Sequence, residues 1–127
     1  MADDQVTLQD LKERMATFVR ERDWEQFHNP KNLSMSIAIE AGELMEHFQW
    51  QTVEQSTRLD DETLQQVGEE LADIVLYSLS MANYLKLDLT ETVLAKLEKN
   101  NDKYPKEKVR GRAHKYTWYQ QKEDERE

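Results

Sequence analysis

The chain has 127 residues and a formal net charge of −9, and it contains no cysteine, three glycines and two prolines. Without cysteine there can be no disulfides, thiolate metal sites or cysteine nucleophiles. The negative charge argues against a protein that binds nucleic acid polymers, because such affinity comes largely from neutralising phosphates. Few helix breakers among many Glu, Leu, Lys, Gln and Ala residues predict an all-α fold with one domain.

The distribution of charge and hydropathy along the chain indicates the cellular compartment and the kind of ligand. The N-terminal MADDQVTLQD lacks a basic stretch followed by an apolar run, and no segment reaches the ~18 apolar residues of a membrane span. We therefore expect a cytoplasmic protein that has no membrane partner. Residues 96–115 carry eight Lys or Arg against three acids, so a basic stretch follows an acidic body. This pattern is compatible with a small anionic ligand that is bound through a metal.

The first predicted helix runs from about Thr7 to Arg22. A T-x-x-D capping box, formed by Thr7 and Asp10, marks its start. Its apolar residues recur at spacings of three and four, the period of one helical face, so we expect that face to be buried. These residues are Leu8, Leu11, Met15, Phe18 and Val19.

The second predicted helix runs from about Leu33 to Trp50, and Asn32 is its candidate cap. Glu40 falls on the apolar face of this helix, and Glu43 falls at the edge of that face. A carboxylate on an apolar face is unfavourable unless a positive charge meets it. This helix therefore predicts a site for a cation.

The third predicted helix, from about Asp61 to Lys86, repeats the pattern. Glu70 lies on its apolar face, and Asp73 lies at the edge with the same spacing and offset as the acids of the second helix. One such pair could arise by chance, since a lone helical Glu is usually a solvated or ion-paired surface residue. Two pairs with the same spacing and offset predict that the four acids act together in one site.

The fourth predicted helix begins near Leu89 and ends by Tyr104, because Pro105 cannot continue it. The remaining segment, residues 106–127, is charged and predicted to be a loosely ordered C-terminal tail. The domain then comprises residues 1–105. Four helices of these lengths predict a four-helix bundle-type fold.

The four acids suit a magnesium site. Hard divalent cations such as Mg²⁺ prefer oxygen ligands, and carboxylates that converge from two helices supply them. The pattern therefore predicts a metal-dependent enzyme that acts on phosphates, in which Glu40, Glu43, Glu70 and Asp73 bind the metal.

The histidines do not predict a different metal centre. A di-iron bundle needs paired Glu-x-x-His motifs, and Glu25 with His28 provides a single copy in a loop. His47 falls on an apolar face, and we expect a core or interface residue, since Mg²⁺ prefers oxygen. His28 could contact a phosphate of the ligand or cap its loop, and its context leaves both roles open.

Aromatic and polar residues near the acids are candidates for ligand contacts. Trp24, Trp50 and Tyr77 could stack on a nucleobase, although aromatic residues more often belong to a core. Lys96 and Asn100 lie four residues apart on the fourth helix and could face phosphates. A surface position is the usual alternative for such a lysine.

Over about residues 5–105 the chain resembles the MazG-like, all-α nucleoside triphosphate pyrophosphohydrolases. The Glu-x-x-Glu … Glu-x-x-Asp signature of that family falls on the four acids named above. The resemblance is closest to the dCTP pyrophosphatase subgroup. The segments that carry it are RDWEQFHNPKNL, EAGELMEHFQW, EELADIVLY and KNNDKYP.

The resemblance implies Mg²⁺-dependent hydrolysis of a (deoxy)nucleoside triphosphate, dCTP or a modified dCTP, to the monophosphate and pyrophosphate, a nucleotide-pool house-cleaning reaction. It also implies that Trp24, Trp50 and Tyr77 line the pocket for the base and sugar. Lys96 and Asn100 would contact the triphosphate or the acids. The chains would form a homo-oligomer, a dimer or a tetramer, whose sites are shared between subunits. Glu43 is our candidate for activating the attacking water. Position 15 is Met where some dCTP-selective relatives carry histidine.

Two alternatives remain open. The chain could be a MazG-like enzyme for another substrate, such as dUTP, an oxidised nucleotide or a phosphoribosyl intermediate. It could also be a non-catalytic helical adaptor or antitoxin-like module with a degenerate site, although the intact acids argue against this. Pyrophosphate release across a panel of nucleotides distinguishes the two classes.

Overall fold

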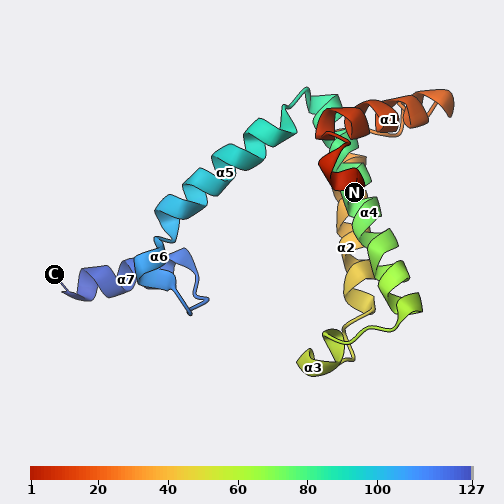
Figure 1. The fold of residues 1–127 in the computed structure, drawn as a ribbon. Coiled ribbons are helices and arrows are strands. Elements are labelled where there is room, and N and C mark those ends of the chain that lie inside the picture. The colour runs from red at the N-terminus through yellow and green to blue at the C-terminus, as the bar shows by residue number, and fades with distance from the viewer. Residues whose placement is uncertain (127) are drawn as a thin grey trace. The chain divides into compact units, whose positions relative to one another are not determined.

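The structure, a computed structural model, describes residues 1–126, and every regular element within them is helical, as predicted (Figure 1). The chain divides into two compact units, the first comprising residues 1–89 and the second beginning at Thr90. None of the helices in the described residues is long and apolar enough to cross a membrane. The elements are a 3-10 helix η1 (Ala2–Asp4), α1 (Leu8–Glu21), α2 (Pro30–Glu46), α3 (Val53–Ser56), α4 (Asp61–Leu85), α5 (Leu89–Lys103), α6 (Lys106–Val109) and α7 (Tyr116–Arg126).

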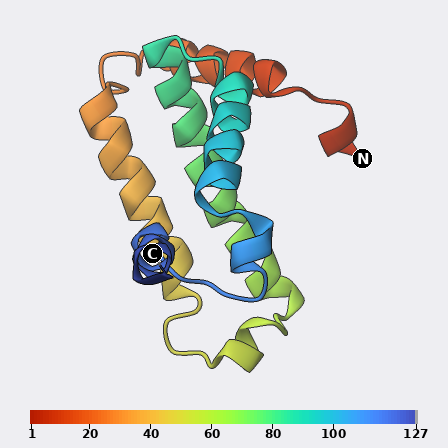
Figure 2. The same cartoon turned by 90° about the vertical axis from the view of Figure 1, so that its left-hand side faces the viewer.

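The first unit is built on the packing of α2 against α4, with α1 packed on α4. Figure 1 and Figure 2 show α2 and α4 side by side and running in opposite directions, while α1 lies across them near the C-terminal end of α4. The core lies where these three helices meet. Its buried apolar residues are Met15 and Val19 from α1, Leu33 from α2, and Leu79 and Ala82 from α4.

Two hydrogen bonds connect α1 to the end of α4. The Lys12 ammonium donates to the Leu87 carbonyl at 2.8 Å, and the Asn83 amide donates to the Lys12 carbonyl at 2.9 Å. The predicted start of α1 is confirmed, because Thr7 and Asp10 form both hydrogen bonds of a capping box. These contacts fix the helix that later forms one wall of the candidate site.

Helix α2 begins three residues earlier than predicted, at Pro30. Asn29 caps it, since its side-chain oxygen accepts a hydrogen bond from the backbone N–H of Asn32 at 3.0 Å. Proline fits the first helical turn because it has no N–H to leave unpaired there. The prediction that Asn32 is the cap is therefore wrong, and so is the predicted end at Trp50, since α2 ends at Glu46.

Helix α4 has almost the predicted bounds. Asp60 caps its start by accepting a hydrogen bond from the Thr63 N–H at 2.7 Å. Its end is marked by Lys86, which adopts a left-handed backbone conformation with φ of 56°. Glu70 and Asp73 therefore lie on one unbroken helix of 25 residues.

The second unit contains α5, α6 and α7. Helix α5 ends before Pro105, as predicted, whereas α6 and α7 occupy the segment that the sequence predicted to be a loosely ordered tail. Tyr119 is buried there, and its hydroxyl accepts a hydrogen bond from the backbone N–H of His114 at 3.1 Å. The His114 ring stacks on Trp118 with centroids 3.9 Å apart. Aromatic packing thus accounts for local structure in a charged segment, and the boundary of the functional domain stays a prediction.

Candidate functional site

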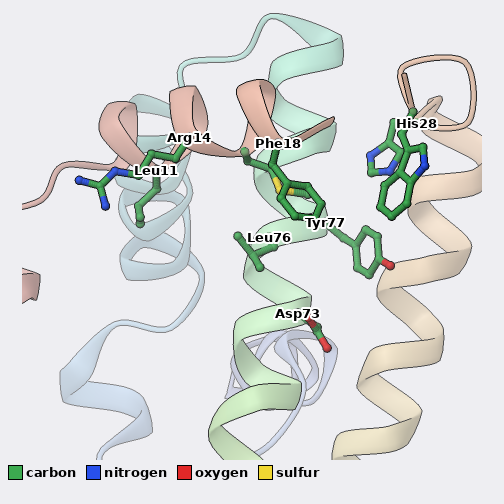
Figure 3. Close-up of a pocket in the computed structure, with 9 residues that line it drawn as sticks. Leu11, Arg14, Phe18, His28, Asp73, Leu76 and Tyr77 are labelled. Carbon is green, nitrogen blue, oxygen red and sulfur yellow. The ribbon is translucent and has the colours of Figure 1, made fainter. Parts of the chain in front are cut away.

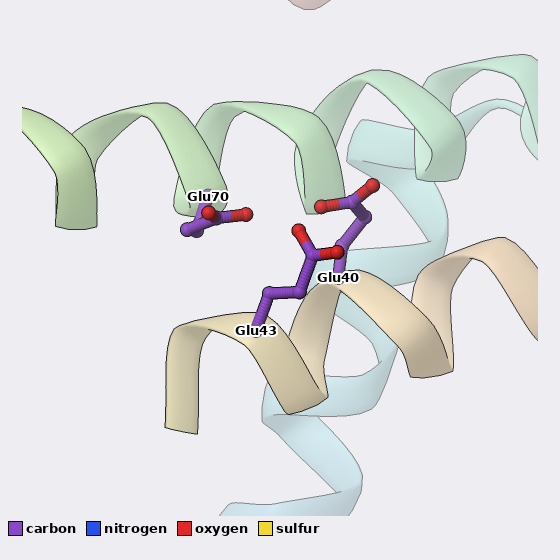
Figure 4. A group of neighbouring side chains, drawn as sticks. All are labelled: Glu40, Glu43 and Glu70. Atoms are coloured by element: carbon purple, nitrogen blue, oxygen red, sulfur yellow. The ribbon is translucent and has the colours of Figure 1, made fainter. Parts of the chain in front are cut away.

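Three carboxylates from two helices meet between α2 and α4. Glu40 and Glu43 project from α2 toward Glu70 of α4 (Figure 4). One carboxylate oxygen from each residue lies within 4.8 Å of the other two. The Oε2 atoms of Glu40 and Glu70 are buried and have no hydrogen-bond partner within the described residues. Such a cluster needs either protons or a cation to be stable, because unpaired buried charge is unfavourable.

The pKa of Glu40 reflects this crowding. Burial, hydrogen bonds shared with Glu43 and Glu70, and the charges of Glu43 and Asp73 raise the pKa of Glu40 to about 7. Asp73, the fourth predicted acid, lies outside the group of three but close enough for its charge to act on Glu40. The predicted set is thus a tight group of three with Asp73 beside it.

His47 lies at the edge of these acids rather than only in a core. Its Nε2 atom is 3.9 Å from Oε1 of Glu70, and both side chains are about four-fifths buried. The three carboxylates offer oxygen donors alone, which fits a divalent metal ion that prefers oxygen. The cluster could therefore bind a metal, and His47 contacts one of its ligands.

A cavity of about 430 Å³ adjoins Asp73, within the range for small-molecule sites (Figure 3). Aromatic rings and apolar side chains form most of its wall, and Arg14 and Asp73 are its charged members. The cavity is built from three separate parts of the chain, namely α1, the loop that follows it, and α4. The lining residues are Leu11, Arg14, Met15, Phe18, Trp24, His28, Asp73, Leu76 and Tyr77.

Three rings follow one another along the wall of the cavity. Trp24 and His28 stack with centroids 6.3 Å apart and planes 20° apart, and the centroid of Tyr77 is 6.2 Å from that of His28. Burial lowers the pKa of His28, which favours the neutral form of its ring. Such a row of flat faces is suited to a planar ligand.

Tyr77 connects the cavity with the acids. Burial, followed by the charges of Glu40, Asp73 and Glu43, raises the pKa of the Tyr77 phenol. The hydroxyl group therefore stays protonated and lies within the field of the carboxylates. A ligand with a planar group in the cavity would have its other end near the acids.

The other predicted contacts are not in the cavity of a single chain. The Trp50 side chain is 88% exposed and does not line the cavity. Lys96 and Asn100 lie on α5 in the second unit. The ligand-binding roles of these three residues stay predictions.

Sequence reasoning missed Arg14 as a lining residue. Leu11, Met15 and Phe18 of α1 were expected on a buried face, and together with Arg14 they form a wall of the cavity, where Met15 also belongs to the core. Helical periodicity identifies a covered face but does not reveal whether a helix or a cavity lies against it. Arg14 lies beside that apolar face, but nothing in the sequence around it indicates a role in the cavity.

The profile of the MazG-like family matches residues 35–118, a range that includes all four predicted acids. The chain belongs to the MazG-like family. Relatives of this MazG-like chain include dCTP pyrophosphatase 1 from Bos taurus, which is 41% identical over 113 residues, 87% of this chain and 67% of the relative. The protein of the same name from Homo sapiens is 38% identical over 113 residues, 87% of this chain and 66% of the relative. The chain spans about two thirds of the length of these relatives.

A solved structure extends the likeness of this MazG-like chain to three dimensions. The crystal structure of a pyrophosphatase from Archaeoglobus fulgidus matches with a TM-score of 0.68 and 36% identity. The match covers 76% of this chain and 91% of that one.

Proposed function

We propose that this chain is a cytoplasmic enzyme that hydrolyses a (deoxy)nucleoside triphosphate to the monophosphate and pyrophosphate, with dCTP or a modified dCTP as the preferred substrate. The observation that carries the proposal is the cavity with its row of rings, directly beside a cluster of carboxylates. The first suits a nucleobase, and the second suits a metal ion that meets phosphates. The similarity to dCTP pyrophosphatase 1 supports the choice of base.

We propose Mg²⁺ as the metal, held by Glu40, Glu43 and Glu70 with Asp73 beside them. The oxygen-only donor set and the two buried carboxylate oxygens without partners support this assignment. When bound, Mg²⁺ supplies positive charge that offsets the repulsion between the carboxylates and the phosphates and stabilises the leaving pyrophosphate.

The residues of the chain itself would bind and orient the substrate. Trp24 and Tyr77 provide flat faces for the base, which also exclude water from that end of the cavity. Glu43 is the exposed member of the acid cluster, so water can reach its carboxylate. In the proposed step Glu43 accepts a proton from water, the water oxygen bonds to the α-phosphorus, and the bond from the α-phosphorus to the bridging oxygen of the β-phosphate breaks. Pyrophosphate takes the electron pair and leaves.

We also propose that the chain forms a dimer or tetramer with shared sites, in which Trp50, Lys96 and Asn100 contribute to ligand binding. Support comes from large apolar side chains that a single chain leaves in water, an arrangement typical of surfaces that other chains cover. They include Met35 and Ile39 on α2, Leu64 and Leu71 on α4, and Leu94 and Leu97 on α5.

A nucleotide panel tests the proposed activity. The purified chain is incubated with dCTP, 5-methyl-dCTP, dUTP, dTTP, dATP, dGTP and CTP, in Mg²⁺ and in EDTA, and the products are separated by anion-exchange chromatography. We expect equal amounts of dCMP and pyrophosphate from dCTP in Mg²⁺ alone, with the highest kcat/KM for the cytosine deoxynucleotides. Release of phosphate and dCDP would contradict the proposed bond. The absence of products from every nucleotide would favour the adaptor.

A further inference from the structure

Ser80 is a buried polar residue whose hydroxyl is directed to the candidate site. It lies on α4 among core residues, with 6% of its surface exposed. Its Oγ atom is 3.4 Å from Nδ1 of His28, far away in the sequence. By contrast, Ser78 on the same helix donates to the Ile74 carbonyl at 2.7 Å, the usual bond of a helical serine. Ser80 thus has a long-range partner where its neighbour has a local one.

The His28 ring lies between two cavities. One side of the ring borders the cavity with Trp24 and Tyr77. His28 also borders a second cavity of about 420 Å³, which Val19 and Ser80 help to line. Besides the neighbouring rings of Trp24 and Tyr77, the hydrogen bond to Ser80 is the polar contact that can fix the rotation of the His28 ring.

The same bond determines which nitrogen of His28 carries the proton. A neutral imidazole has one N–H donor and one bare nitrogen acceptor. Among the hydrogen bonds of the described residues, Nδ1 of His28 is the partner of the Ser80 side chain. A buried hydroxyl is unfavourable without an acceptor, and a bare Nδ1 would be that acceptor. The ring proton then lies on Nε2, which points away from Ser80.

We propose that Ser80 is a positioning residue that holds His28 as the Nε2–H tautomer, so that His28 offers a hydrogen-bond donor to a nucleobase in the cavity. This inference rests on the proposed function, since it names a base as the ligand. Cytosine has a bare N3 that accepts a hydrogen bond, whereas uracil and thymine carry a proton on N3. A donor that meets N3 therefore favours cytosine, and Ser80 contributes to the choice of base without touching it.

The tautomer is measured first, by NMR of the whole chain with ¹⁵N-labelled histidine and no nucleotide. The chain has three histidines, and spectra of His47→Gln and His114→Gln assign the signals of His28 by elimination. We expect the Nε2–H pattern in the unaltered chain and in Ser78→Ala, the matched control. Ser80→Ala should show a mixture of the two tautomers. Ser80→Thr keeps the hydroxyl and should again show the Nε2–H tautomer alone, since the second cavity leaves room for the methyl group. An Nδ1–H pattern in the unaltered chain would overturn the inference.

The choice of base is measured next, as the ratio of kcat/KM for dCTP to that for dUTP. Ser80→Ala should lower the ratio about three- to tenfold, the effect of one neutral hydrogen bond, mostly through a higher KM for dCTP. Ser78→Ala and Ser80→Thr should keep it. An equal loss for both nucleotides in Ser80→Ala would indicate a merely structural role and overturn the inference. No turnover with any nucleotide in the unaltered chain would contradict the proposed function instead, and the NMR result would still decide the tautomer.

Discussion

The acid cluster and the aromatic cavity are neighbours, but their side chains differ in whether they find partners within the chain. In the cavity, the His28 ring lies beside those of Trp24 and Tyr77, and its Nδ1 atom has the Ser80 hydroxyl as a partner. In the cluster, Glu40 and Glu70 each keep a buried oxygen without a partner. The rings of the cavity therefore support one another within the chain, whereas the buried carboxylate oxygens of the cluster need a proton or a cation from outside it. The difference is consistent with the proposed roles, in which the cavity selects the base and the cluster binds the metal.

The largest expected effect comes from removing one charge of the cluster. Glu40→Gln should lower kcat/KM for dCTP on the order of 10³-fold, since a lost metal ligand removes several kcal/mol of charge stabilisation. Mg²⁺ binding, measured by isothermal titration calorimetry, should weaken in parallel. Glu46→Gln is the matched control, because Glu46 is exposed at the end of the same helix and outside the cluster. Similar losses in both variants would remove the distinction between cluster and surface.

Removing a ring should act on binding rather than on chemistry. Trp24→Ala should raise KM for dCTP roughly 10- to 100-fold, with a much smaller change in kcat, because stacking on a base is worth about 1–3 kcal/mol. Phe27→Ala is the control, since Phe27 lies in the same loop, is exposed and does not line the cavity. A fall in kcat with unchanged KM would mean that the cavity belongs to the catalytic machinery and not to base recognition.

The cluster should also make the metal-free chain sensitive to pH. The pKa of Glu40 is about 7 in the folded chain against 4.5 for an ordinary glutamate, so the folded chain binds more protons between these values. The free energy of unfolding must then fall as pH rises from about 4.5 to 7. The stabilising contribution of the protonated Glu40 is complete only below that pH range. In EDTA, Tm should drop by roughly 2–5 °C more from pH 5 to pH 8 in the unaltered chain than in Glu40→Gln.

Thermal melting with and without Mg²⁺ checks this expectation. Mg²⁺ should restore most of the lost stability at pH 8, since the cation replaces the proton on Glu40. Equal pH slopes for the unaltered chain and Glu40→Gln would contradict the raised pKa.

The smallest effect concerns the start of α2, which joins the loop of the cavity to the helix of the cluster. Asn29→Ala should lower the free energy of unfolding by about 1 kcal/mol, the usual contribution of a helix cap. Asn32→Ala should cost less, because it removes an exposed side-chain hydrogen bond to the Phe27 carbonyl and leaves the cap in place. Urea unfolding measures both, and the reverse order would support the cap that the sequence predicted.

The sequence predicted the cluster better than the cavity for a physical reason. The period of a helix decides which residues share a face, so the pairs at Glu40 and Glu70 could be found from local spacing alone. The cavity joins α1 and the loop that follows it to a distant part of the chain, α4, and no local pattern indicates that Arg14 lines it or that Ser80 contacts His28. Such contacts depend on how the helices pack, which a single sequence does not contain.

The ends of helices and the exposure of single side chains were also harder to predict, because they too depend on the three-dimensional structure. Asn29 and Asn32 are both plausible caps by type, and only the backbone around Pro30 decides between them. Trp50 was expected at the base pocket, yet in one chain it is exposed beyond the end of α2. The predicted all-α class was secure because it rests on composition over the whole chain.

Lys86 has a practical consequence for anyone who engineers this chain. It ends α4 in a left-handed conformation, with φ of 56°, that glycine adopts without steric cost. Relieving the strain at that turn would therefore stabilise the fold, and Lys86 belongs neither to the residues that line the cavity nor to the acid cluster. A glycine introduced there would add tolerance to heat, and variants that sacrifice stability for a new substrate preference could draw on that tolerance.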